Sequence, residues 1–189
     1  STIMHTDTLH LLDALMKQRL KTEQVVDYEL GYCLGIGSIT DPRLVSTLHL
    51  FKTERYIVRV EQRIGERFPH PAQQQQAISE GFRRLNAHFP DAKLPANVVF
   101  LNSYFKTGAF ATDKDLAIGL EWYLGAKTDV IAELPPQEFY EWMKEGMEGR
   151  YLERDAVASW VVTHLIDTPA DPNNIEAMIY WGKILYLTE

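Results

Sequence analysis

The feature that most constrains this chain is a single block of strand-like sequence inside an otherwise helical pattern. Asn97–Leu101 has the β-branched and aromatic composition typical of a strand, and residues 110–112 and 116–120 indicate two more short strands. The polar turn 113–115 joins the last two, which predicts a hairpin. We therefore expect an α+β fold with a small antiparallel sheet.

Helical periodicity covers most of the remaining sequence, and no linker-like segment or internal repeat interrupts it. We expect one mostly helical α+β domain over residues 1–189. The expected helices span 7–20, 23–36, 42–64, 73–89, 137–147 and 153–166, with a last one from residue 172 onward. In that last helix the spacing predicts an inward face made of Ile175, Met178, Ile179, Gly182 and Leu185 or Tyr186.

The bulk composition excludes several classes of protein. A formal net charge of −7 argues against a nucleic-acid partner, because binding phosphate groups needs a basic face. The single cysteine, Cys33, cannot form an internal disulfide, and its apolar neighbours indicate a buried, inert thiol. No apolar run approaches the ~20 residues of a membrane-spanning helix. No signal peptide follows Ser1, although a removed export signal would leave no trace.

A lone histidine, His164, lies four residues after Trp160 in the apolar stretch 159–165. A single histidine on an apolar helix face needs no metal, so we expect hydrogen bonds from its ring to the backbone or to a carboxylate. The alternative is a rearranged metal site that combines His164 with Asp167 and an acid. That acid would be Glu121 or Glu176.

Three stretches of the second half together resemble one protein family. They are Ile118 to Gly125 (IGLEWYLG), the helix from Asp155 to His164, and Met178 to Tyr186 (MIYWGKILY). Their order and spacing are similar to the GldB family of gliding-motility lipoproteins from Bacteroidetes, as is Phe89-Pro90 followed by Pro95. This resemblance covers roughly residues 45–189 and leaves the helical residues 1–40 outside it.

The GldB family in turn resembles proteins predicted to be zinc-dependent proteases, which carry HExxH on one helix and a glutamate before a glycine on a later one. Two histidines at i and i+4 bind Zn²⁺, and the glutamate between them polarises the metal-bound water. By this resemblance Trp160, Val161 and His164 occupy the HExxH positions, and Trp181 occupies the later glutamate position. Valine cannot act as a base and indole cannot bind zinc, so we predict a degenerate zincin-like core with no metal and no cofactor.

Two large tryptophans in these positions would convert a catalytic cleft into packed core. A residual cleft would instead be lined by Asp113, Glu121, Trp122, Tyr180 and Tyr186. In zincins a strand near the active-site helix binds extended peptide, so the hairpin could keep a peptide-binding edge. For Asp113, Asp115 and Glu121 themselves we expect a solvated turn and a polar strand face.

The resemblance implies a non-catalytic cell-envelope protein that acts through contacts with other envelope, gliding or secretion proteins. It also implies a lipid anchor at a removed N-terminal cysteine, on the periplasmic side of the membrane. Two alternatives stay open. One is a metal-dependent peptidase with rearranged ligands, and the other is a module that binds peptides or cell-wall fragments at an aromatic cleft.

Overall fold

A three-stranded mixed sheet lies at the centre of the computed structural model, which describes residues 2–188. The strands are β1 (Asn97–Leu101), β2 (Ala109–Ala111) and β3 (Asp115–Gly119), in the order β1-β3-β2. The predicted hairpin is confirmed, because β2 and β3 pair antiparallel. The prediction of a purely antiparallel sheet is wrong, because β1 pairs with β3 in parallel. The α+β class holds.

Helices make up most of the rest of the chain. In order they are α1 (Thr2–His5), α2 (Leu11–Arg19), α3 (Glu23–Tyr28) with its π-helical continuation η1 (Glu29–Cys33), α4 (Leu44–Thr53), α5 (Arg55–Arg67), α6 (Pro71–His88), the 3₁₀ turn η2 (Leu120–Tyr123), α7 (Asp129–Ala132), α8 (Glu141–Gly146), the 3₁₀ turn η3 (Gly149–Tyr151), α9 (Leu152–His164) and α10 (Asn174–Thr188). Among the described residues, none of these helices is both long and apolar enough to cross a membrane.

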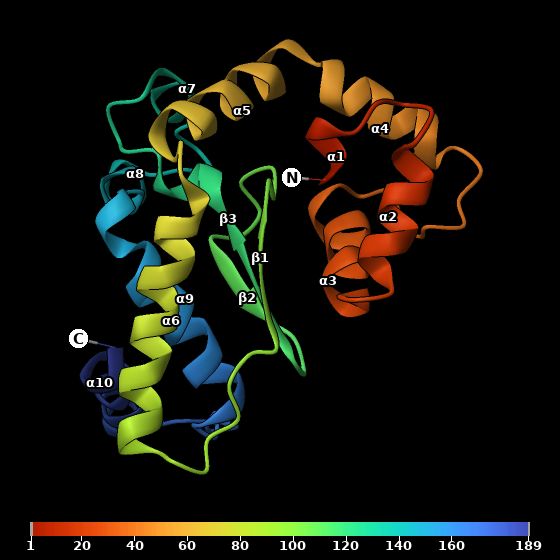
Figure 1. The fold of residues 1–189 in the computed structure, drawn as a ribbon. Coiled ribbons are helices and arrows are strands. Elements are labelled where there is room, and N and C mark those ends of the chain that lie inside the picture. Colours follow the sequence, from red (N-terminus) through yellow and green to blue (C-terminus); the bar gives the residue numbers. More distant parts are fainter. Residues whose placement is uncertain (1, 189) are drawn as a thin grey trace.

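The sheet is covered by helices on both faces (Figure 1). On one face Leu101 and Ala117 pack against Val25 of α3. On the other face Leu116 and Ile118 belong to the main core, which α6 and α9 complete. Because both faces of the sheet are covered, all five residues of β3 are buried, including the carboxylate of Asp115.

One predicted helix, residues 42–64, is divided into α4 and α5. The break falls at Glu54, whose backbone is extended with ψ of 133°. Its carboxylate accepts a hydrogen bond of 2.9 Å from the backbone N–H of Ile57, so Glu54 acts as the N-cap of α5. A glutamate is not among the preferred capping residues, so no local signal in the sequence indicates this boundary.

The loop after β1 wraps around a fully buried carboxylate, that of Glu121. Its Oε1 accepts hydrogen bonds from the backbone N–H groups of Ser103 (2.8 Å) and Phe105 (3.2 Å) and from the Ser103 hydroxyl. Tyr104 and Phe105 both adopt positive φ, an uncommon conformation for residues other than glycine. The carboxylate thus holds this loop in place, and the expectation that Glu121 and Asp115 are solvated is wrong, because both are buried.

The predicted inward face of the last helix is also wrong. In α10 the buried side chains are Tyr180 and Ile184, and the helix packs on α9. The residues expected to face inward are exposed: Ile175, Met178, Ile179, Leu185 and Tyr186. Cys33, by contrast, is buried as expected, and this burial raises the pKa of its thiol to about 12.

Candidate functional site

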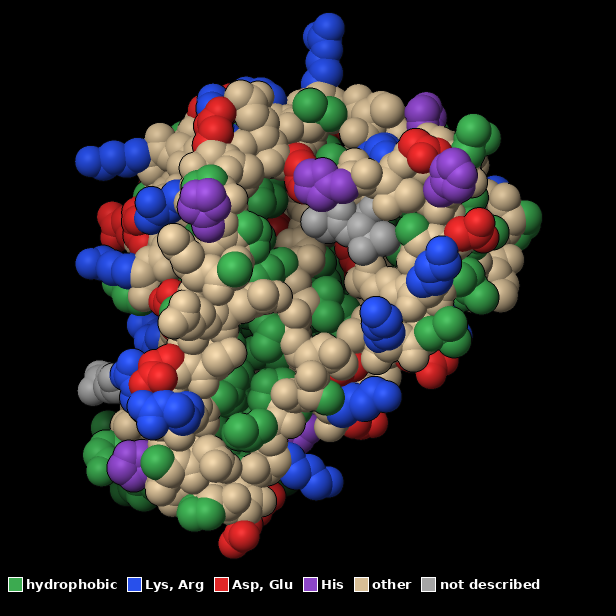
Figure 2. All heavy atoms as spheres, in the orientation of Figure 1, with side chains coloured by type: hydrophobic (Ala, Val, Ile, Leu, Met, Phe, Trp, Pro, Cys, Tyr) green, Lys and Arg blue, Asp and Glu red, His purple; other side chains and the backbone are tan. Residues whose placement is uncertain are grey.

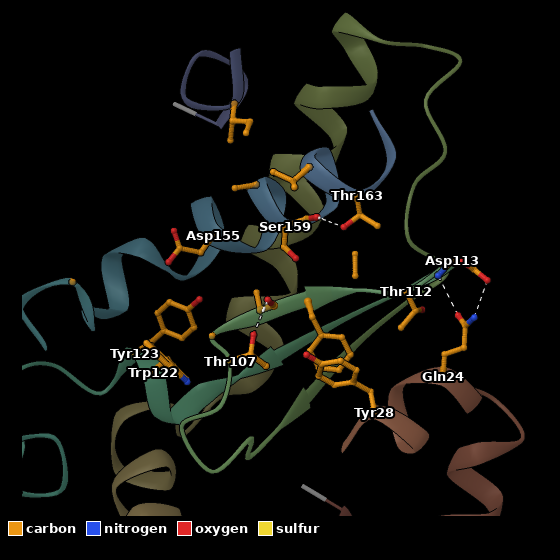
Figure 3. Close-up of a pocket in the computed structure, with 18 of the residues that line it drawn as sticks. Gln24, Tyr28, Thr107, Thr112, Asp113, Trp122, Tyr123, Asp155, Ser159 and Thr163 are labelled. Atoms are coloured by element: carbon orange, nitrogen blue, oxygen red, sulfur yellow. Dashed lines mark hydrogen bonds between the residues drawn. The ribbon is translucent and has the colours of Figure 1, made fainter. Parts of the chain in front are cut away.

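An open groove of about 870 Å³ runs along the free edge of β2, between that strand and α9. Figure 3 shows side chains from the sheet, α3 and α9 converging on it. The groove is lined by Gln24, Tyr28, Thr107, Gly108, Ala109, Phe110, Ala111, Thr112, Asp113, Trp122, Tyr123, Gly146, Asp155, Ala158, Ser159, Val162, Thr163, Trp181 and Ile184.

Aromatic side chains from four elements of the chain, α3, β2, η2 and α10, supply the apolar surface of the groove. Tyr28 of α3 and Phe110 of β2 pack together with ring centroids 4.1 Å apart. Trp181 of α10 is 58% exposed and lies on the groove. Trp122 also lines it, and within residues 2–188 its buried Nε1 has no hydrogen-bond partner. A ligand acceptor that reached this N–H would satisfy it.

The outer edge of β2 presents unused backbone hydrogen-bonding groups at Ala111, whereas the carbonyl of Ala109 accepts a hydrogen bond from the Thr107 hydroxyl (3.1 Å). Gly108 and Thr112 bond to β3, through Gly119 N–H to Gly108 O (2.9 Å) and Thr112 N–H to Asp115 O (2.8 Å). In an antiparallel pair alternate residues bond to the partner strand, so the N–H and C=O of Ala111 point away from β3. The strand can therefore accept a further strand at this edge.

The two ends of the groove carry polar side chains. At the hairpin turn, Gln24 Nε2 donates to Asp113 Oδ2 (2.7 Å), while Asp113 N–H donates to Gln24 Oε1 (3.1 Å). At the other end, burial and the adjacent Asp155 carboxylate raise the pKa of the Tyr123 phenol, which keeps it protonated at neutral pH. Both ends of the groove thus carry polar groups.

Helix α9 divides its side chains between the groove and the core. Ser159, Val162 and Thr163 face the groove, and the Thr163 hydroxyl donates to the Ser159 carbonyl (2.9 Å). Trp160 and Val161 are fully buried away from it. The hydroxyl and apolar groups that α9 offers suit contact with a peptide.

The other face of α9 holds His164 in a hydrogen bond. Its Nε2 lies 2.8 Å from the carbonyl oxygen of Thr112, and because a carbonyl only accepts, Nε2 donates. The ring stacks near that of Trp160, with centroids 4.0 Å apart, and the Trp160 Nε1 donates to the Lys93 carbonyl (2.8 Å). The expected hydrogen bond at His164 is confirmed, and it ties α9 to the end of β2.

The comparison with known families decides the family of this chain. The family described as "Gliding motility protein GldB" matches residues 8–189. The chain belongs to the GldB family. This match begins well before residue 45 and so includes α2 and α3, which the motifs in the sequence did not cover.

Membership of the GldB family indicates a gliding-motility lipoprotein and a location in the cell envelope. It connects the protein with the envelope or gliding machinery without identifying a partner. No curated protein and no solved structure matches the chain. The relation to zinc proteases stays a prediction.

The structure separates the residues that the resemblance placed at a degenerate metal site. Trp160, Val161 and His164 do not line the groove, whereas Trp181 does. Because Trp181 is more than half exposed, the expectation that both tryptophans fill the core holds for Trp160 only. The hydroxyl residues of α9 that line the groove at i, i+4 spacing are Ser159 and Thr163.

The residues predicted to line a cleft also lie in different places. Asp113 and Trp122 line the groove, Glu121 is buried beneath the loop after β1, and Tyr180 is buried against α9. Tyr186 is exposed and borders a second hollow, next to α6. Sequence reasoning missed Tyr28, Phe110, Ser159 and Thr163, since no local pattern shows that α3 and α9 meet at one strand.

The rearranged metal site considered as an alternative is not assembled in the folded chain. Within residues 2–188, no three His, Cys, Asp or Glu side chains come together in a way that could hold one metal ion. His164 contacts the hairpin at Thr112, beside the start of β3, whereas Glu121 follows the far end of that strand. At about 3.3 Å per residue, the five residues of β3 place these groups well over 10 Å apart.

Proposed function

We propose that this GldB-family protein is a non-catalytic component of the cell envelope that acts through contacts with other gliding or secretion proteins. In this proposal it is held on the periplasmic side by a lipid anchor. The groove beside β2 binds an extended segment of a partner protein, which adds as a further strand to the edge of the sheet.

The free edge of β2 is the observation that carries this proposal. The outward N–H and C=O of Ala111 can form main-chain hydrogen bonds with a peptide of almost any sequence. Tyr28, Phe110 and Trp181 provide apolar surface for alternate side chains of that peptide. Ser159 and Thr163 line the opposite wall with small hydroxyl side chains that leave room for a bound chain.

Replacing Ala111 with proline should abolish this mode of binding without unfolding the sheet. Proline removes the outward N–H and places its ring at the edge, but the hydrogen bonds between β2 and β3 do not use this N–H. Peptides that bind the wild-type protein would be selected from a random display library. Their affinity for the wild type and the variant would then be measured by fluorescence anisotropy. We expect A111P to weaken their binding at least about tenfold, the effect of about 1.4 kcal/mol.

Two controls make this test decisive. A111S keeps the N–H and should bind the peptides as the wild type does, and thermal unfolding should show A111P to be folded. Equal binding by A111P would contradict strand addition. The selected peptides should also be recovered intact after incubation with the protein and zinc. Their cleavage, detected by mass spectrometry, would favour the peptidase alternative.

A further inference from the structure

Helix α10 carries a continuous stripe of exposed apolar side chains. Ile175, Met178, Ile179, Leu185 and Tyr186 are each between 52% and 85% exposed. Single exposed apolar residues are normal, but a contiguous stripe along one helix marks an interaction surface. Figure 2 shows hydrophobic side chains gathered at the lower left edge of the molecule, where Figure 1 places α10.

The spacing of the stripe is symmetrical about Gly182. Ile179 and Leu185 lie three residues to either side of it, and Met178 and Tyr186 lie four residues to either side. In an antiparallel pair of α10 helices that crosses at Gly182, Ile179 of one copy would face Leu185 of the other. Met178 would face Tyr186 in the same way. The stripe therefore complements itself, as an interface with two-fold symmetry requires.

Gly182 suits the crossing point of such a pair. A Cβ built at this residue would meet no heavy atom within 4 Å, so the space outside the glycine is open. The distance between two packed helices depends on the side chains at their contact, and glycine allows the closest approach. The i±3 and i±4 positions around it supply the ridges that interdigitate in packed helices.

The stripe carries no charges that would oppose pairing with a second copy of the same chain. Each copy carries a net charge of −7, but the stripe itself contains no charged residue. Pairing two stripes therefore brings no like charges into direct contact.

The available area indicates a weak, reversible association. Helix α10 has 15 residues and is therefore about 22 Å long at 1.5 Å per residue. Two such stripes would bury on the order of 1,000 Å² in total, close to the lower limit for specific protein interfaces. We propose that α10 is a homodimer interface, in which two copies pair their α10 helices antiparallel about a two-fold axis at Gly182.

Sedimentation velocity over a concentration series from micromolar to millimolar tests this proposal. We expect the weight-average mass to rise from that of the monomer, 21.7 kDa, toward twice that value. I179K introduces a charge into the stripe, and because Ile179 is exposed in the monomer the variant should fold normally. It should weaken the dimer at least about tenfold, because each copy brings one lysine into the apolar contact.

A matched control and a test of the helix register tie the association to this particular pairing. L20K changes an equally apolar residue at the end of α2 that is 87% exposed, and it should leave the association unchanged. A mixture of I179C and L185C proteins should form a mixed disulfide under oxidation more readily than either variant alone, since buried Cys33 does not compete.

Three results would overturn the proposal. The first is a mass of 21.7 kDa at every concentration. The second is an equal loss of association in L20K and I179K. The third is a protein that stays monomeric in solution but sediments with phosphatidylethanolamine vesicles through α10, which would assign the stripe to a membrane surface. Peptide binding by the groove is measured separately, so failure here does not affect the proposed function.

Discussion

Replacing Trp160 with alanine should lower the free energy of unfolding by about 3 to 5 kcal/mol. The indole is fully buried and packs edge-on against Phe82 of α6, with ring centroids 6.2 Å apart. Its removal leaves a large cavity between α6 and α9 and exposes one face of the His164 ring. It also leaves the Lys93 carbonyl without the hydrogen bond from the indole N–H.

Urea denaturation followed by circular dichroism would measure this loss. W181A is the matched control, since it removes the same side chain from an exposed site on the groove. We expect W181A to cost less than about 1 kcal/mol, because surface substitutions rarely cost more. Similar losses for the two variants would show that the tryptophans are equally buried, which would contradict the placement of Trp160 in the core and Trp181 on the surface.

The stability of the protein should fall as the pH rises from about 4.5 to about 7. Burial raises the pKa of Glu121 to about 7, against hydrogen bonds from Ser103 and Phe105 that lower it. Burial, with a contribution from Glu121, also raises the pKa of Glu29 to about 7. The folded protein then binds more protons than the unfolded chain, whose glutamates titrate near 4.5, so raising the pH favours unfolding.

The variant E121Q isolates the share of this effect that belongs to Glu121. Its amide oxygen can still accept the bonds from Ser103 and Phe105, but it carries no charge at any pH. Relative to the wild type, E121Q should gain stability by about 3 kcal/mol between pH 4.5 and pH 7, the equivalent of the shift in pKa.

Urea denaturation at a series of pH values would measure this gain. E145Q removes a carboxylate from an exposed site of α8. Its free energy of unfolding should change with pH in the same way as that of the wild type. A constant difference between E121Q and the wild type over this range would mean that Glu121 titrates normally. In that case its burial would not govern the pH dependence.

Local sequence predicted the elements of this fold better than their arrangement. The strand at 97–101 and the hairpin were predicted to within one residue, because β-branched composition and a polar turn are local signals. The parallel pairing of β1 with β3 was not predicted, since it depends on which strand takes the central position in the sheet. The inward face of α10 was assigned wrongly because apolar periodicity identifies a face of a helix but not what covers it.

The candidate site shows the same division. The hydrogen bond of His164 followed from the general rule that buried polar groups find partners. The groove could not be predicted, because Tyr28 and Phe110 are far apart in the sequence and meet only through the packing of α3 on the sheet. Family motifs pointed to Trp160 and His164, whereas the groove face of α9 lies one residue earlier, at Ser159 and Thr163.

The strand order also determines when the sheet can form. The central strand, β3, is the last of the three in the chain, and β1 and β2 are each bonded to it alone. During synthesis β1 emerges first, but its parallel neighbour begins only at Asp115, opposite Asn97. The hairpin can close as soon as β3 has emerged, because its turn is short. Until then β1 has no strand to pair with, and Val98 and Phe100 stay uncovered.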